Sequence, residues 1–266
     1  IVTVNGEAAD AANYEKVDDT YTFTVESDKK VGEGAAATAE TRKTVTIKIT
    51  NGAVAEIKID GTTVDAEDGY AVIRNLPVGW YTITEDTSNL KYGVGLVGVN
   101  GKRVEVTKGN ENNIPGREFT NNVDVGSLKV TKAFGENSAL TGGDLTAEQK
   151  RAITFDVTGP NNFSDHFTYE DIEAVGYKQY NNLYTGDYSV VETINTEIEG
   201  GAVADYTLST TYDVSSTATV AKTSTEENPA NITVTNTYTR DVGALKIKKI
   251  VTVNGEAADA ANYEKV

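Results

Sequence analysis

The chain of 266 residues contains no cysteine, no methionine, one histidine and four prolines. The absence of cysteine excludes disulfides, thiolate catalysis, thioester chemistry and cysteine-based metal sites. The single imidazole, His166, makes a poor metal site by itself. No apolar run approaches the length of a membrane span, so we expect no membrane insertion in this segment. Without an initiator methionine, we expect an internal or processed piece of a longer protein.

Basic residues are also scarce, because 24 lysines and arginines face 40 aspartates and glutamates and give a net charge of -16. Nucleic acid and anionic lipid both require clustered basic residues, so neither is an expected partner. A GxGxxG match at 93 to 98 lies in a predicted hairpin with no helix after it, which argues against a dinucleotide site. One acidic group could hold calcium, but a solvated loop is the commoner outcome, so we predict no cofactor and no metal. The group comprises Asp60, Asp65, Glu67 and Asp68.

Runs rich in Val, Thr, Ile and Tyr fill most of the sequence and predict β-strands. Asn-Gly and Asp-Gly pairs separate such runs in TVTIKIT-NG-AVAEIKI-DG-TTV and GLVGV-NG-KRVEV, which is a strong hairpin signal. The clearest helix signal is LTAEQKRA at 145 to 152, after Asp144 or Thr146 as a cap. Residues 27 to 43 and 213 to 230 are long polar excursions. We predict an all-β protein with two sandwich domains, at 1–124 and 125–241.

Residues 1 to 17 recur letter for letter as residues 250 to 266. A repeat of this kind indicates an array of modules, in which each module is a pair of domains. We therefore expect the domain at 1–124 to lack the start of its first strand. The segment 242–266 would be the first strand of the next copy of that domain.

In each of three strand-like runs, alternate residues form an apolar face, and the last residue on that face is polar. Period-2 alternation directs the side chain of this polar residue inward with the apolar ones. The polar residues are Lys132, Glu192 and Asn236, in the runs LKVTK, YSVVE and ITVTN. A lone buried charge costs several kcal/mol, so these side chains are tolerable inside a sandwich only if they meet. The same pattern places Glu85, Asn121 and Lys249 at the ends of three further apolar faces.

Each of these residues, taken singly, has an ordinary structural interpretation. The lysine aliphatic chain can extend to solvent, the glutamate can cap a turn and the asparagine can bond to the main chain. Two sets on matching faces favour the chemical interpretation. Burial leaves a lysine amine neutral and a carboxylic acid protonated. The amine can then attack the asparagine carbonyl while the acid polarises it and transfers protons as ammonia leaves. The product is a Lys-Asn isopeptide bond, formed once, so we do not expect a turnover enzyme.

Four strings carry a resemblance to a known family: LKVTK (128 to 132), NLPVGWYTITED (75 to 86), YSVVET (188 to 193) and TVTNTY (233 to 238). They resemble Gram-positive pilin and adhesin-stalk domains of the Cna-B and streptococcal major-pilin type. The resemblance implies tandem Ig-like or transthyretin-like β-sandwiches. It also implies two cross-linking sets, Lys132 to Asn236 with acid Glu192, and Lys249 to Asn121 with acid Glu85. Because Lys249 follows the residues that it should serve, we expect it to lie far from Asn121 of its own chain and to serve Asn121 of the next copy. Strand exchange between separate chains is the non-covalent alternative. Lys129 and Lys246 are excluded because they lie on the opposite strand faces.

The resemblance implies a structural stalk or pilus shaft on a Gram-positive cell surface, extracellular and in contact with further copies of itself from head to tail. The alternative is an adhesin module that binds a host glycan or matrix protein through the excursions 27 to 43 and 213 to 230. A repeat favours spacing over recognition, although a multivalent binder could also repeat. A turnover enzyme is a distant third, because no nucleophile and base pair stands out in the sequence.

Overall fold

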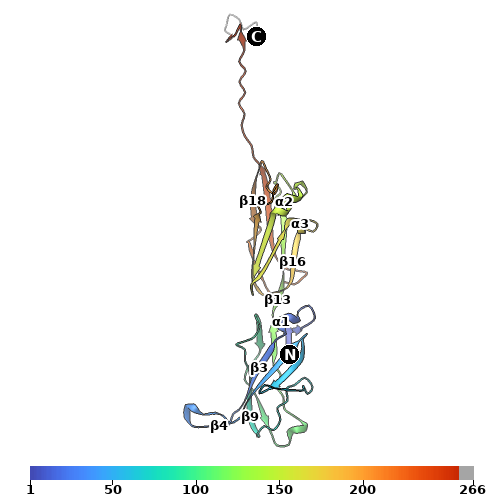
Figure 1. The fold of residues 1–266 in the computed structure, drawn as a ribbon, viewed down its shortest axis with the longest axis vertical. Helices are drawn as coiled ribbons and strands as arrows, with labels where there is room; N and C mark the ends of the chain where they lie inside the picture. The colour runs from blue at the N-terminus through green and yellow to red at the C-terminus, as the bar shows by residue number, and fades with distance from the viewer. Residues whose placement is uncertain (258–266) are drawn as a thin grey trace.

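Alternating apolar and polar residues build four main β-sheets in the computed structural model, which describes residues 1–257 (Figure 1). Two sheets use strands from residues 1–124, here called the first sandwich. The other two use strands from residues 125–241, the second sandwich. The all-β prediction is confirmed. The segment predicted to begin the next copy, 242–266, falls partly outside the described residues, and its described part, 242–257, is here called the tail.

The first sandwich pairs a four-stranded sheet with a six-stranded sheet, and the core includes side chains from both. The smaller sheet has the order β10 (Val94–Val97), β12 (Thr120–Val123), β1 (Val2–Val4) and β2 (Glu7–Ala8). The larger sheet has the order β11 (Lys102–Val106), β9 (Gly79–Glu85), β3 (Thr20–Ser27), β6 (Arg42–Thr50), β7 (Ala53–Ile59) and β8 (Thr62–Val64). The first sandwich also contains the short helical turns α1 (Tyr14–Val17), η1 (Gly34–Ala36) and η2 (Asn110–Asn112).

The second sandwich is built from two four-stranded sheets around one apolar core. One sheet has the order β16 (Tyr177–Tyr184), β13 (Val125–Phe134), β20 (Ala230–Arg240) and β18 (Tyr206–Tyr212). The other has the order β15 (Phe163–Thr168), β14 (Ile153–Gly159), β17 (Gly186–Ile194) and β19 (Thr217–Val220). Short helices follow in η3 (Gly142–Asp144), α2 (Ala147–Ala152) and α3 (Tyr169–Ile172).

Two of the three predicted Asn-Gly and Asp-Gly hairpins are confirmed. The pairs Asn51-Gly52 and Asp60-Gly61 join β6 to β7 and β7 to β8, with positive φ at all four residues, as tight hairpin turns require. The third prediction is wrong, because Asn100-Gly101 connects β10 and β11, which belong to different sheets. Alternation within each strand does not specify which sheet the strand joins.

The predicted helix at 145 to 152 forms as α2, where Thr146 is the N-cap and exchanges hydrogen bonds with Gln149 in a capping box. The excursion 27 to 43 contains a two-stranded ribbon of β4 (Lys30–Val31) and β5 (Thr38–Ala39), which projects from the first sandwich (Figure 1). The excursion 213 to 230 is more ordered than predicted, because it contains β19 paired with β17. Among residues 1–257, no helix is long and apolar enough to span a membrane.

The two sandwiches follow one another directly, because Asp124 alone separates β12 from β13. A small apolar cluster of Val4, Val17, Val123 and Val125 packs at this junction. After β20 the chain continues as the extended tail, which leaves the second sandwich at the end opposite the first (Figure 1). The tail ends in a short hairpin of β21 (Thr252–Val253) and β22 (Glu256–Ala257).

Candidate functional site

The first and last strands of the second sandwich, β13 and β20, lie side by side and run parallel. In their register Lys132 pairs with Val234, so Asn236 lies two residues further along the neighbouring strand. A strand spacing of about 4.8 Å and a rise of about 3.3 Å per residue place the Lys132 and Asn236 Cα atoms about 8 Å apart. Both side chains lie on the inner face, and the residues are 6% and 0% exposed. A lysine and an asparagine side chain together can span that distance.

Glu192 reaches the same point from the opposite sheet, because it lies on β17, where it pairs with Phe155 of β14. Its Oε2 atom lies 2.9 Å from Lys132 Nζ, and the two side chains are 1% and 0% exposed. The contact is an ion pair that lacks hydrogen-bond geometry at Oε2. The main-chain N–H of Glu192 donates to the Tyr212 hydroxyl at 3.1 Å, which fixes this part of β17. The structure therefore brings together the three residues that the sequence pattern selected.

Burial sets the protonation behaviour of the lysine. Removal from water lowers the pKa of Lys132 from 10.5 to about 8, although the neighbouring Glu192 carboxylate acts in the opposite direction. Lys132 Nζ has one further polar contact, with the Val234 carbonyl oxygen at 3.5 Å, and lies 5.3 Å from the centre of the Phe134 ring. A lysine with this pKa is partly neutral at physiological pH, and a neutral amine is a nucleophile.

Thr210 is a site residue that the sequence reasoning missed. It lies on the edge strand β18 opposite Asn236, and its hydroxyl donates to Asn236 Oδ1 at 3.0 Å. The same hydroxyl lies 3.4 Å from Glu192 Oε1. Within the described residues, Asn236 Nδ2 has no hydrogen-bond partner. The asparagine carbonyl therefore accepts a hydrogen bond, while its amide nitrogen donates none within the described residues.

In the first sandwich the structure brings together two members of the second set. Glu85 ends β9 and pairs with Phe23 of β3, as Glu192 pairs with Phe155, and Asn121 lies on β12 in the facing sheet. Both residues are buried. The Asn100 side chain bonds to the main-chain N–H and carbonyl of Glu85, each at 2.9 Å, and so fixes the end of β9. Asn100 thus positions Glu85 instead of forming the predicted hairpin.

The Glu85 carboxylate has no hydrogen-bond partner in the described part of the chain. Burial raises the pKa of Glu85, and the nearby Asn121 amide, the Ile1 amine and Lys102 partly oppose the rise. The amide lies close to Glu85 but outside hydrogen-bond geometry. The third predicted member, Lys249, is exposed in the tail, and the structure does not bring it to Glu85 or Asn121 of the same chain (Figure 1).

The acidic residues considered for calcium do not converge. Asp60 bonds to Lys43 and to the Thr44 main chain, and Glu67 bonds to Arg74. Among residues 1–257, no three His, Asp or Glu side chains are grouped as metal ligands would be. His166 is exposed and contacts Asp156 Oδ1 at 2.8 Å.

No family model matches the chain, and no curated protein matches it. Among solved structures, the chain is similar to the major pilin from Streptococcus pyogenes, at 18% identity and a TM-score of 0.37, over 91% of this chain and 96% of that chain. It is also similar to a bacterial adhesin from Mobiluncus mulieris containing intramolecular disulfide, isopeptide and ester bond cross-links, at 13% identity and a TM-score of 0.30, over 84% and 86%.

A third similar structure is the pilus adhesin SpaC from Lactobacillus rhamnosus GG in an open conformation, at 12% identity and a TM-score of 0.31. That similarity covers 93% of this chain and 31% of the adhesin. The resemblance to Gram-positive pilins and adhesins that the sequence motifs indicated is thus present among solved structures. At these identities the similarity concerns the fold alone.

Proposed function

We propose that the chain is part of a stalk or pilus shaft on a Gram-positive cell surface, and that its second sandwich is closed by a Lys132–Asn236 isopeptide bond. The observation that carries the proposal is the buried meeting of Lys132, Glu192 and Asn236. The three side chains are buried and come from three strands and two sheets, with Lys132 Nζ and Glu192 Oε2 2.9 Å apart. The Asn236 carbonyl beside them is held by the Thr210 hydroxyl.

The chemistry follows from the atoms at that point. The neutral Lys132 amine attacks Cγ of Asn236 and forms the new C–N bond, while negative charge develops on Oδ1 beside the Thr210 hydroxyl. Glu192 takes a proton from the attacking nitrogen and delivers it to Nδ2 as the original C–N bond breaks. One ammonia leaves for each bond formed. Glu192 is not consumed, and the reaction ends when Lys132 and Asn236 are joined.

The topology gives this bond a mechanical consequence. Lys132 and Asn236 lie 104 positions apart and belong to the first and last strands. By analogy with a disulfide that closes a loop of about 100 residues, the bond would stabilise the sandwich by about 4.7 kcal/mol through the unfolded state. Tension entering at Val125 would pass through the bond and leave at Arg240. The residues between 132 and 236 would then carry no load, which suits a stalk.

Single-molecule stretching of the chain by its two ends tests this function. The first sandwich should unfold and release contour length at up to about 3.6 Å per residue. The second sandwich should release none of the length between residues 132 and 236. A Lys132→Arg variant keeps the positive charge but cannot form the amide, and it should release that length. If the unsubstituted chain also releases it, the proposed load-bearing role is wrong.

A further inference from the structure

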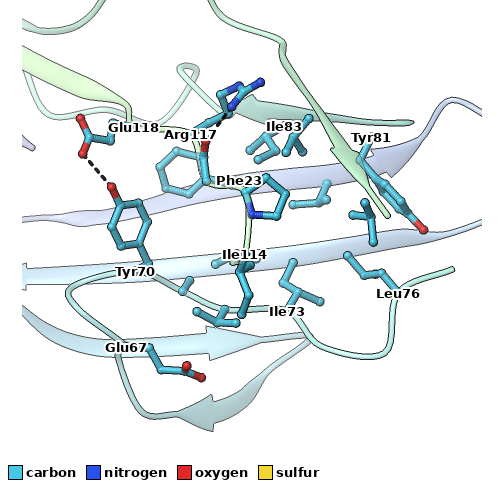
Figure 2. A pocket seen from close by; sticks show the side chains of 18 of the residues that line it. Phe23, Glu67, Tyr70, Ile73, Leu76, Tyr81, Ile83, Ile114, Arg117 and Glu118 are labelled. Atoms are coloured by element: carbon cyan, nitrogen blue, oxygen red, sulfur yellow. Dashed lines mark hydrogen bonds between the residues drawn. The ribbon is translucent and has the colours of Figure 1, made fainter. Parts of the chain in front are cut away.

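The first sandwich contains a cavity of about 1070 Å³ between the inner face of its six-stranded sheet and two segments without strand structure (Figure 2). Phe23, Tyr81 and Ile83 line it from the sheet, and Ile73 and Ile114 line it from the two segments. Protein interiors are normally close-packed, with few voids larger than a water molecule. A space of this size with an apolar wall on its sheet side is suited to a further strand with apolar side chains on that face.

The two segments beside the cavity, 71–77 and 114–119, have main-chain N–H groups that donate no hydrogen bond within the described residues. Some of their carbonyls are engaged, because the Ile1 amine donates to Phe119 O at 2.9 Å, the Lys102 side chain to Glu118 O and the Tyr81 hydroxyl to Pro77 O. The Tyr70 hydroxyl next to the first segment donates to Glu118 Oε1 of the second at 2.7 Å, as Figure 2 shows. Extended segments with free main-chain N–H groups beside apolar side chains are able to pair with an added strand.

Segment 71–77 has a structural equivalent in the second sandwich, and that equivalent is paired with a neighbouring strand. Asn75 and Asn182 both have positive φ, at 58° and 54°. Six residues after each, the Tyr81 and Tyr188 hydroxyls donate to the carbonyls four residues earlier, at 2.8 and 3.0 Å. Segment 71–77 therefore corresponds to most of β16, and β16 pairs with β13.

The segment 114–119 leads into Asn121 as the first half of β20 leads into Asn236, so these two stretches also correspond. In the second sandwich β13 lies between β16 and β20 and pairs with both. The first sandwich has only β1 (Val2–Val4) in that place. The strand that fits the cavity is thus an equivalent of the part of β13 up to Lys132.

The tail carries such a strand. The run DVGALKIKK at 241 to 249 matches DVGSLKVTK at 124 to 132, which enters β13. Leu128 and Val130 of that strand are 0% exposed, whereas the matching Leu245 and Ile247 are 84% and 87% exposed. The tail therefore presents to solvent the two apolar side chains that the second sandwich buries at these positions.

We propose that the cavity of the first sandwich binds segment 243–249 of a preceding copy, as a strand between segments 71–77 and 114–119. The strand register supports this occupant. Val2 of β1 pairs with Asn121, and Phe134 of β13 pairs with Asn236, so Val2 and Phe134 occupy equivalent positions in the two sandwiches. Lys132 lies two positions before Phe134. Lys249 takes the corresponding position, because it directly precedes Ile250, the second copy of Ile1.

Docking therefore completes the second set, with Lys249 from one copy and Glu85 and Asn121 from the next. Only the covalent step rests on the proposed function. In that step the Lys249 amine forms a bond to Cγ of Asn121, the bond to Nδ2 breaks and one ammonia leaves, with Glu85 transferring the proton.

A peptide of residues 241–249 with a fluorophore at its amino end tests the proposal. It is titrated into the full chain carrying Ile247→Asn, so that the tail of the chain does not compete. We expect saturable binding that Ile247→Asn in the peptide weakens at least about tenfold, because that side chain is buried on docking. Lys246→Asn, on the opposite strand face, is the matched control and should change affinity less than about threefold.

Incubation should then yield a peptide adduct that has lost one ammonia and joins Lys249 to Asn121. Asn121→Ala in the chain should abolish the adduct but not the binding. No saturable binding, or equal weakening by Ile247→Asn and Lys246→Asn, would overturn the docking proposal even where the second sandwich carries its Lys132–Asn236 bond. Docking that depends on Ile247, with no bond in either sandwich, would support the strand site and refute the proposed chemistry.

Discussion

Lys132 Nζ lies 2.9 Å from Glu192 Oε2, and the two side chains are 0% and 1% exposed. Burying two charges together costs free energy that their attraction offsets only in good geometry, so such a pair is weak evidence of a role in stability. Asn236, whose amide nitrogen has no hydrogen-bond partner in the described residues, is buried on the neighbouring strand, which fits the proposed chemical role instead.

The first prediction concerns the acid. Glu192→Gln preserves volume but cannot accept and return a proton, so the Lys132–Asn236 bond should not form. Intact mass should then lack the loss of one ammonia from the second sandwich, and the melting temperature of that sandwich should fall. Glu226→Gln, at an exposed loop position, is the control and should leave both unchanged. Normal loss of ammonia in Glu192→Gln would reduce Glu192 to a structural residue.

The second prediction concerns the hydroxyl of Thr210. Thr210→Val removes the donor to Asn236 Oδ1, and loss of one such donor should slow bond formation at least about tenfold. Thr211→Val, the next residue on the same strand, makes the same change on the opposite face and should leave the rate unaltered. For both variants the starting material is chain that was purified in denaturant before the bond formed. The rate of bond formation is then followed by intact mass as the chain refolds. Equal rates for the two variants would exclude a role for Thr210.

The third prediction is a pH dependence. The pKa of Lys132 in the folded chain is lowered to about 8, so below that pH most of the amine is protonated and unreactive. The rate of bond formation during refolding should rise about tenfold per pH unit up to about pH 8 and then level off. A rate that keeps rising to about pH 10, as for an exposed lysine, would mean that burial does not activate Lys132.

The fourth prediction concerns the effect of Glu85 on the stability of the first sandwich. Burial raises the pKa of Glu85 in the folded chain, so ionisation of Glu85 removes stability from the first sandwich as pH rises through that raised pKa. Glu85→Gln should therefore raise the melting temperature of the first sandwich at pH 7, with the gain disappearing below about pH 4.

Trp80 is the only tryptophan and lies on β9, so its fluorescence reports melting of the first sandwich. Glu105→Gln, exposed on the adjacent β11, is the control and should have little effect. If Glu85→Gln lowers the melting temperature at pH 7, the carboxylate has a stabilising partner and this account of the first sandwich is wrong.

Period-2 alternation was sufficient to select Lys132, Glu192 and Asn236, because it determines which face of a strand each side chain occupies. It could not select Thr210, since threonine is a common strand residue and the pattern around it carries no distinguishing signal. The turn signal at Asn100-Gly101 led to a wrong hairpin prediction, because such a signal does not show whether the chain returns to its own sheet or crosses to the other. The side-chain bonds between Asn100 and the Glu85 main chain become evident only in the folded structure.

The Lys132–Asn236 bond itself can be tested by intact mass and peptide mapping of the folded chain. We expect the mass to be lower than the sequence mass by one ammonia for the second sandwich. Digestion should release a branched fragment that joins the β13 peptide containing Lys132 to the β20 peptide containing Asn236. A folded and aged sample with the full sequence mass, and with Lys132 in an unbranched peptide, would contradict it.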